Sequence, residues 1–187
     1  NHSSGKMGYA LAEAARDRGA DVVLVTAPTS LADPALVKVV RVQTAQEMGT
    51  AIQEHASDAD ALVMAAAVAD YRPAETADQK IKKSNDEMRI ELAKTEDILK
   101  TAKGKFVRVG FAAESENLVE NAKSKVSSKS LDLIVANDIT ADGSGFGSDT
   151  NKVALIDRDL AVEELPLLTK YDVSNRILDR VKALFKD

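Results

Sequence analysis

The first residues of the chain combine side chains that suit an anion. Residues 1–6 read NHSSGK, and apolar residues at helical spacing follow at once. Two hydroxyls, a glycine and a lysine at a helix start favour an anion site, because free N–H groups and the positive end of the helix dipole face the ligand. A helix capped by Ser3 or Ser4 is the alternative. A Walker A loop is excluded, since no glycine stands five residues before Gly5 and Lys6.

A second candidate binding site is the carboxyl end of the apolar run at residues 61–68, which read ALVMAAAV. Ligands of open α/β sheets bind beyond the carboxyl ends of strands, and small side chains there let a planar group approach the backbone. Asp70 follows two residues later and suits a ribose hydroxyl or a metal ion. The alternative is a core strand that ends in a turn aspartate.

Lysines form two further candidates. Lys80 lies ten residues after Asp70 in a polar segment that continues as Lys82 and Lys83, which favours a phosphate-binding flap. A solvated loop is the alternative.

On a predicted helix, Lys125 and Lys129 are four residues apart and share one face, whereas Lys123 points nearly the opposite way. A solvated helix face explains the same spacing. Phe111 ends a predicted strand and could stack on a base, although a core position is the default. The glycine-rich residues 143–147 precede a strand instead of opening a helix, so they are not a dinucleotide fingerprint.

The composition predicts one soluble, cytoplasmic domain. The 187 residues are 44% hydrophobic and 29% charged, with a net charge of −5 and no long basic run, which argues against nucleic acid or an anionic membrane as partner. No cysteine is present, so disulfides and thiolate chemistry are excluded. The longest apolar stretch, residues 61–69, is too short to span a bilayer, and no signal peptide opens the chain.

Strand and helix patterns alternate along the chain, which is typical of a parallel or mostly parallel α/β sheet. Strands are expected at residues 21–26, 37–42, 61–68, 88–92, 106–111, 131–136, 153–156 and 160–166. Helices are expected from Ser3 or Ser4 to Gly19 and at residues 44–55, 96–102, 117–129 and 173–185. The runs at 21–26 and 61–68 read as strands buried on both faces. The chain starts without methionine and almost at once in a helix, so we expect residues 1–187 to be a single, N-terminally truncated domain.

Taken together, the motifs resemble the phosphopantothenate–cysteine ligase family. The matching segments are NHSSGKMG at 1–8, AAVADYRP at 66–73, KIKK at 80–83, VGFAAE at 109–114, DLIVAND at 132–138 and GFGSDTN at 145–151. This resemblance implies a Rossmann-like, doubly wound, mostly parallel sheet that lacks the family's N-terminal strand and glycine-rich loop. In bacteria such a domain is usually the C-terminal half of a bifunctional protein whose N-terminal half is a flavin-dependent decarboxylase.

The resemblance also implies a site for CTP and Mg²⁺. It assigns nucleotide binding to Met64, Ala65, Ala66, Asp70, Lys80, Ala93, Lys94, Thr95, Glu96, Phe111, Lys125 and Lys129. Asp70 would face the ribose–phosphate region or the divalent cation, and the backbone of residues 93–96 would read the cytosine edge. Asn1 resembles the asparagine needed to form an acyl-cytidylate, and Lys80 the lysine that acts in its conversion. Thr95 and Glu96 stand where relatives often carry Asn-Pro.

The implied partners are CTP, 4′-phosphopantothenate, cysteine and a second copy of the chain. Both phosphorylated substrates are polyanions, so an acidic protein needs local lysines, helix N-termini and Mg²⁺ to bind them. Two other classes remain open. A nicotinamide-dependent oxidoreductase has the same sheet pattern but needs a glycine fingerprint that is not found here. The other class is a non-catalytic nucleotide-binding domain.

Overall fold

Five strands form the central sheet of the computed structural model, which describes residues 3–75, 77, 79–80, 88–141, 143–145 and 147–185. The strands are β3 (Ala61–Met64), β6 (Val107–Glu114), β7 (Leu133–Asp138), β9 (Val153–Asp157) and β10 (Val162–Glu164). Their order is β10-β9-β7-β6-β3. β3, β6 and β7 are parallel, whereas β9 and β10 add in antiparallel orientation. The sheet is therefore mostly parallel, as the sequence predicts.

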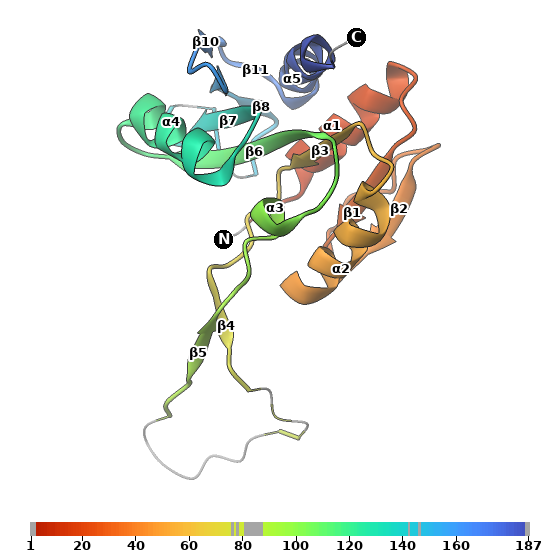
Figure 1. Cartoon of the computed structure of the whole chain (residues 1–187), viewed down its shortest axis with the longest axis vertical. Helices are drawn as coiled ribbons and strands as arrows, with labels where there is room; N and C mark the ends of the chain where they lie inside the picture. The colour runs from red at the N-terminus through yellow and green to blue at the C-terminus, as the bar shows by residue number, and fades with distance from the viewer. Residues whose placement is uncertain are drawn as a thin grey trace.

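Helices cover both faces of this sheet, which confirms the doubly wound arrangement (Figure 1). Because side chains alternate along a strand, Val109 and Val135 point to one face and Ala112 and Ile134 to the other. The first face packs against α1 (Lys6–Asp17) and α5 (Lys170–Leu184). The second packs against α4 (Leu118–Lys129). The two apolar layers hold the parallel strands, and with them the strand ends, in fixed positions.

A smaller unit carries the first two strands. β1 (Val23–Thr26) and β2 (Lys38–Arg41) form a parallel pair, and α2 (Ala45–Ala56) and α3 (Ile98–Thr101) share a third core cluster with them and with β3. The prediction that residues 21–26 and 61–68 are buried on both faces is wrong. Val23 is 39% exposed, and all of β3 is only half-buried. In the described part of the chain β1 pairs only with β2 and β3 only with β6, so each strand lies at a sheet edge.

Two strands outside both sheets form an arm that projects from the molecule (Figure 1). They are β4 (Tyr71–Pro73) and β5 (Leu92–Lys94), an antiparallel pair. The sequence predicts a strand at 88–92 and none at 71–73. The arm strands pair with each other and bury little, so they leave no core-facing pattern in the sequence.

The helix ends follow local chemistry. Thr44 begins α2 as predicted: its hydroxyl accepts the Glu47 N–H at 3.1 Å, and the Glu47 carboxylate accepts the Gln43 N–H at 2.8 Å. The predicted serine cap of α1 is replaced by Gly5, whose φ of 78° is left-handed. α5 begins at Lys170, three residues before the predicted start, because Thr169 caps it. None of the described helices has the length and apolar character needed to cross a membrane.

Candidate functional site

The predicted nucleotide residues on three segments meet at the carboxyl edge of the sheet. Met64, the last residue of β3, lies opposite Gly110 of β6, which continues beyond it to Glu114. The chain then enters the arm, where the Asp70 carbonyl accepts the Thr95 N–H at 2.8 Å and Tyr71 pairs with Lys94. Backbone contacts thus tie Asp70 and Tyr71 to Thr95 and Lys94, and residues 64–66 lie a few positions before them in the chain.

Two lysines of α4 reach the same edge, and both are paired there. Lys125 Nζ lies 2.5 Å from a carboxylate oxygen of Glu114, the last residue of β6. Lys129 Nζ lies 2.9 Å from Asp97, which caps α3 directly after residues 93–96. The expected positive charge of this helix face is therefore largely balanced by carboxylates that the sequence reading did not assign to the site.

Asp97 joins α3 to α4 at this edge. Its carboxylate accepts the Lys100 N–H at 3.2 Å and pairs with Lys129. Partial burial raises the pKa of Asp97, but the hydrogen bonds from Lys129 and the Lys100 backbone outweigh it, so the pKa lies below its ordinary value. Asp97 is accordingly charged at neutral pH and keeps Lys129 facing residues 93–96.

Apolar residues predicted to bind the nucleotide lie on two different faces of the sheet. Phe111 and Ala65 pack against the core under α1 and α5, whereas Met64 packs on the α4 side. The Phe111 ring is only half-buried, but it lies on the face opposite Lys125 and Lys129. The structure does not bring Phe111 and these lysines together on one face.

The start of α1 contacts the glycine-rich loop that follows β7. Lys6 Nζ donates to the Asp149 carboxylate at 2.7 Å and to the Gly147 carbonyl at 3.0 Å. The Lys6 ammonium, which the sequence presents as part of an anion site, is thus already paired. Asn1 lies outside the described residues, as do Lys82 and Lys83, whereas Lys80 is described and exposed.

Asp138 lies at the same edge, at the end of β7, and shapes the entry to that loop. Its carboxylate accepts the Thr140 hydroxyl at 2.7 Å and the backbone N–H groups of Thr140 and Ala141. These hydrogen bonds, with that of the Thr140 hydroxyl the strongest, lower the pKa of Asp138. All three hydrogen bonds go to Oδ1, so this oxygen of Asp138 orders the turn that begins the loop.

The metal-binding capacity of this edge is small. The described residues include no group of three or more His, Cys, Asp or Glu side chains that could hold a metal ion. Asp70 offers one exposed carboxylate. Mg²⁺ is usually held by one or two carboxylates together with substrate phosphates. Asp70 therefore fits a Mg²⁺ ion that arrives with a nucleotide, and not a resident metal.

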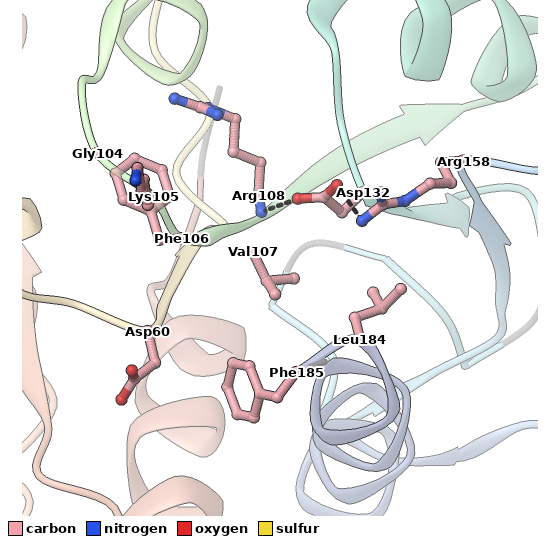
Figure 2. Close-up of a pocket in the computed structure, with 10 residues that line it drawn as sticks. All are labelled: Asp60, Gly104, Lys105, Phe106, Val107, Arg108, Asp132, Arg158, Leu184 and Phe185. Atoms are coloured by element: carbon pink, nitrogen blue, oxygen red, sulfur yellow. Dashed lines mark hydrogen bonds and ion pairs between the residues drawn. The ribbon is translucent and has the colours of Figure 1, made fainter. Parts of the chain in front are cut away.

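A hollow of about 680 Å³ lies at the opposite, amino edge of the sheet (Figure 2). It is bounded by residues that precede β3, β6 and β7, among them Asp60 and Phe106. Asp132 accepts the Arg108 N–H at 2.7 Å and pairs with Arg158 at 2.7 Å. These charged groups bind one another, and none of the residues predicted to bind a nucleotide lines this hollow.

The helices on both faces and the polar groups gathered beyond parallel strand ends define a Rossmann-like α/β domain with its candidate site at the carboxyl edge. Residues 1–185 match the family described as DNA/pantothenate metabolism flavoprotein C-terminal domain. The chain belongs to this family.

Two curated relatives and one solved structure illustrate the similarity. The chain is 45% identical over 190 residues to the coenzyme A biosynthesis bifunctional protein CoaBC of Bacillus subtilis, and covers 47% of it. It is 41% identical to a cysteine/cysteine sulfinic acid decarboxylase of an unknown prokaryotic organism, of which it covers 53%. The crystal structure of the C-terminal domain of a CoaBC protein superposes with a TM-score of 0.81 at 42% identity, over 97% of this chain and 83% of that one. The chain spans about half the length of the curated relatives it matches.

Proposed function

We propose that the chain carries out the ligase step of coenzyme A biosynthesis, joining 4′-phosphopantothenate to cysteine at the expense of CTP. Similarity to bifunctional coenzyme A biosynthesis proteins supports the pathway. The observation that carries the specific activity is the convergence of residues 64–66, Asp70, residues 93–96 and the two α4 lysines at one sheet edge. These are the positions that the resemblance assigns to CTP.

In this proposal the backbone of residues 93–96 reads the cytosine edge. The segment is held by its pairing with β4 and the Asp70–Thr95 hydrogen bond on one side, and it is followed by the Asp97 cap of α3 on the other. A segment fixed at both ends presents its amides and carbonyls without a large ordering cost. Lys125 and Lys129 then exchange part of their contact with Glu114 and Asp97 for the phosphates.

The reaction has two steps. The carboxylate of 4′-phosphopantothenate attacks the α-phosphate of CTP, and pyrophosphate leaves. The amine of cysteine then attacks the carbonyl carbon of the acyl-cytidylate and loses a proton, and CMP leaves with the electrons of the broken acyl–phosphate bond. Lys80, which is exposed and lies between β4 and β5 in the sequence, supplies a positive charge to oxygens that become more negative in the second step. Bound beside Asp70 with the nucleotide, Mg²⁺ would neutralise phosphate charge.

The arm supports a second part of the proposal, which is a homodimer. Four large apolar side chains on or beside β4 and β5 are 60–64% exposed: Tyr71, Met88, Ile90 and Leu92. A grouped set of exposed apolar side chains is typical of a protein–protein contact. We propose that two copies of the chain cover them mutually.

Calorimetric titration with Mg²⁺ and CTP, ATP or NAD tests the nucleotide assignment. CTP should bind more tightly than ATP, since the backbone of residues 93–96 is proposed to recognise a pyrimidine edge. NAD should not bind, whereas an oxidoreductase of this fold would prefer it. Equal affinity for CTP and ATP would refute the base assignment, and tight binding of NAD alone would favour the oxidoreductase.

A further inference from the structure

Lys170 is a buried lysine that the proposed chemistry does not use. It is 7% exposed and is the first residue of α5. Its ammonium donates to Asn151 Oδ1 at 2.7 Å, to the Thr150 carbonyl at 3.2 Å and to the Gly145 carbonyl at 3.4 Å. An ammonium has three N–H donors, so all of them are used. None of these acceptors carries a charge.

Burying this cation has a cost that its neighbours only partly offset. Burial lowers the pKa of Lys170, repulsion from Lys6 lowers it further, and Asp149 raises it. A methionine of similar length would avoid that cost if the position served only for packing. The residue is therefore best explained by what its three hydrogen bonds hold in place.

Those hydrogen bonds hold the glycine-rich loop, residues 143–145 and 147–151, which we call the clamped loop. It lies between the starts of α5 and α1. On the α5 side, the Lys170 N–H also donates to the Asp149 carbonyl at 3.0 Å. On the α1 side, Lys6 binds Asp149 and Gly147, and Asn151 Nδ2 donates to Met7 Sδ at 3.6 Å. A continuous set of contacts thus runs from Lys170 through the loop to the first turn of α1.

We propose that Lys170 is a positioning residue that, through the clamped loop, fixes the first turn of α1 and Lys6 on the acid-substrate side of the site. This inference rests on the proposed function, in which Asn1, just before α1, acts in acyl-cytidylate formation. All the residues assigned to CTP lie on or beside β3, the arm, β6 and α4, and none lies on α1, α5 or the clamped loop. Loss of the clamp should therefore impair use of 4′-phosphopantothenate and spare CTP binding.

The test compares Lys170→Met with Lys182→Met, a matched change at an exposed lysine of the same helix. In Lys170→Met, amide hydrogen exchange should speed up in residues 147–151 and in the first turn of α1. The value of kcat/KM for 4′-phosphopantothenate should fall about 10- to 100-fold, because small displacements at a site have effects of that size. The Kd for CTP should stay within about twofold of wild type. Lys182→Met should match wild type in all three measurements.

A second variant keeps the proposal testable if Lys170→Met does not fold. Asp149 has an 87% exposed side chain, so Asp149→Asn should fold normally while releasing Lys6 from the loop. It should lower kcat/KM for 4′-phosphopantothenate in the same direction as Lys170→Met, and the two changes together should be less than additive.

Three outcomes overturn the inference. The first is a folded Lys170→Met variant with wild-type rates of amide hydrogen exchange in residues 147–151 and the first turn of α1. The second is an equal loss of CTP affinity and of kcat/KM for 4′-phosphopantothenate, and the third is a wild-type kcat/KM in Asp149→Asn. A wild-type protein without ligase activity would refute the proposed function instead. The exchange measurement would still decide whether Lys170 holds the loop and α1 together.

Discussion

Two lysines at the candidate site are paired with carboxylates. Lys125 pairs with Glu114 and Lys129 with Asp97, although the sequence alone suggests a row of free cations on α4. Such pairs keep side chains pointed at the strand ends before a ligand arrives. They also mean that a bound phosphate competes with a carboxylate, so each lysine contributes less than an unpaired one would.

Substitution of the α4 lysines tests this view of the nucleotide site. Lys125→Ala and Lys129→Ala should each raise the Kd for CTP about tenfold, which corresponds to about 1.4 kcal/mol. Lys123→Ala, on the same helix but off their shared face, should change it less than about twofold. Calorimetry on the three variants measures the difference. Similar losses in all three would indicate a diffuse electrostatic field without specific contacts.

Lys80 should act in chemistry more than in binding. Lys80→Gln keeps hydrogen bonding but removes the charge, so CTP affinity should be nearly unchanged while ligated product forms roughly 10²–10³-fold more slowly. Acyl-cytidylate should accumulate, because the second step is the one impaired. Quenched-flow samples that follow pyrophosphate and product separately give the answer. Wild-type rates of both would make Lys80 an ordinary solvated lysine.

At the scale of elements, the sequence predicts the helices and strands that bury a regular apolar pattern in the core. The apolar runs place β6, β7 and β9 to within a few residues, and α4 ends at Lys129 as expected, because these elements bury a regular pattern. The sequence does not predict β4 or the short pair β8 (Thr150–Asn151) and β11 (Leu168–Thr169), and its strand at 88–92 ends where β5 begins. Their positions depend on backbone pairing and on loop contacts such as those of Lys170, which leave no periodicity in the sequence.

The same limit applies to the site. Motifs identify residues 64–66 and 93–96, and backbone pairing places Met64 beside β6 and β5 beside β4. Spacing does not assign Glu114 or Asp97 to the site, because their lysine partners are 11 and 32 residues away in the sequence. It does not assign Lys170 either, because that role depends on three oxygen atoms of a loop. The VGFAAE motif, which ends at Glu114, was the only sequence signal for any of them.

The Asp97–Lys129 pair, which joins α3 to α4, should make the free energy of unfolding depend on pH in the acidic range. The folded state lowers the pKa of Asp97, so the pair stabilises the fold above the ordinary aspartate pKa and loses this effect as pH falls through the folded value. Lys129→Met should therefore lower the free energy of unfolding at neutral pH by less than about 1 kcal/mol, since both side chains are over one-third exposed.

Urea unfolding at neutral and at strongly acidic pH measures this difference, with Lys123→Met as control. The wild-type advantage over Lys129→Met should vanish at the acidic pH, and the carboxyl NMR titration of Asp97 should move to higher pH in the variant. An unchanged Asp97 titration would show that the pair does not persist in solution.

At the scale of the whole molecule, the arm is the feature that a single copy leaves unexplained. Its apolar side chains are about 60% exposed and stand away from all three core clusters. If two copies pair through it, Ile90→Ser with Leu92→Ser should convert a dimer to a monomer in sedimentation experiments, with little loss of fold stability. Val162→Ser, at another exposed apolar position, should remain dimeric. A wild-type monomer at micromolar concentration would contradict the proposed dimer.

Formation of the ligated product tests the central claim most directly. Purified protein is incubated with Mg²⁺, 4′-phosphopantothenate and labelled cysteine, with either CTP or ATP, and 4′-phosphopantothenoylcysteine, CMP and pyrophosphate are quantified. We predict product with CTP, equimolar release of CMP and pyrophosphate, and much slower turnover with ATP. Absence of labelled product with CTP, from protein that is folded and binds the nucleotide, would contradict the proposed ligase and leave a nucleotide-binding domain without this activity.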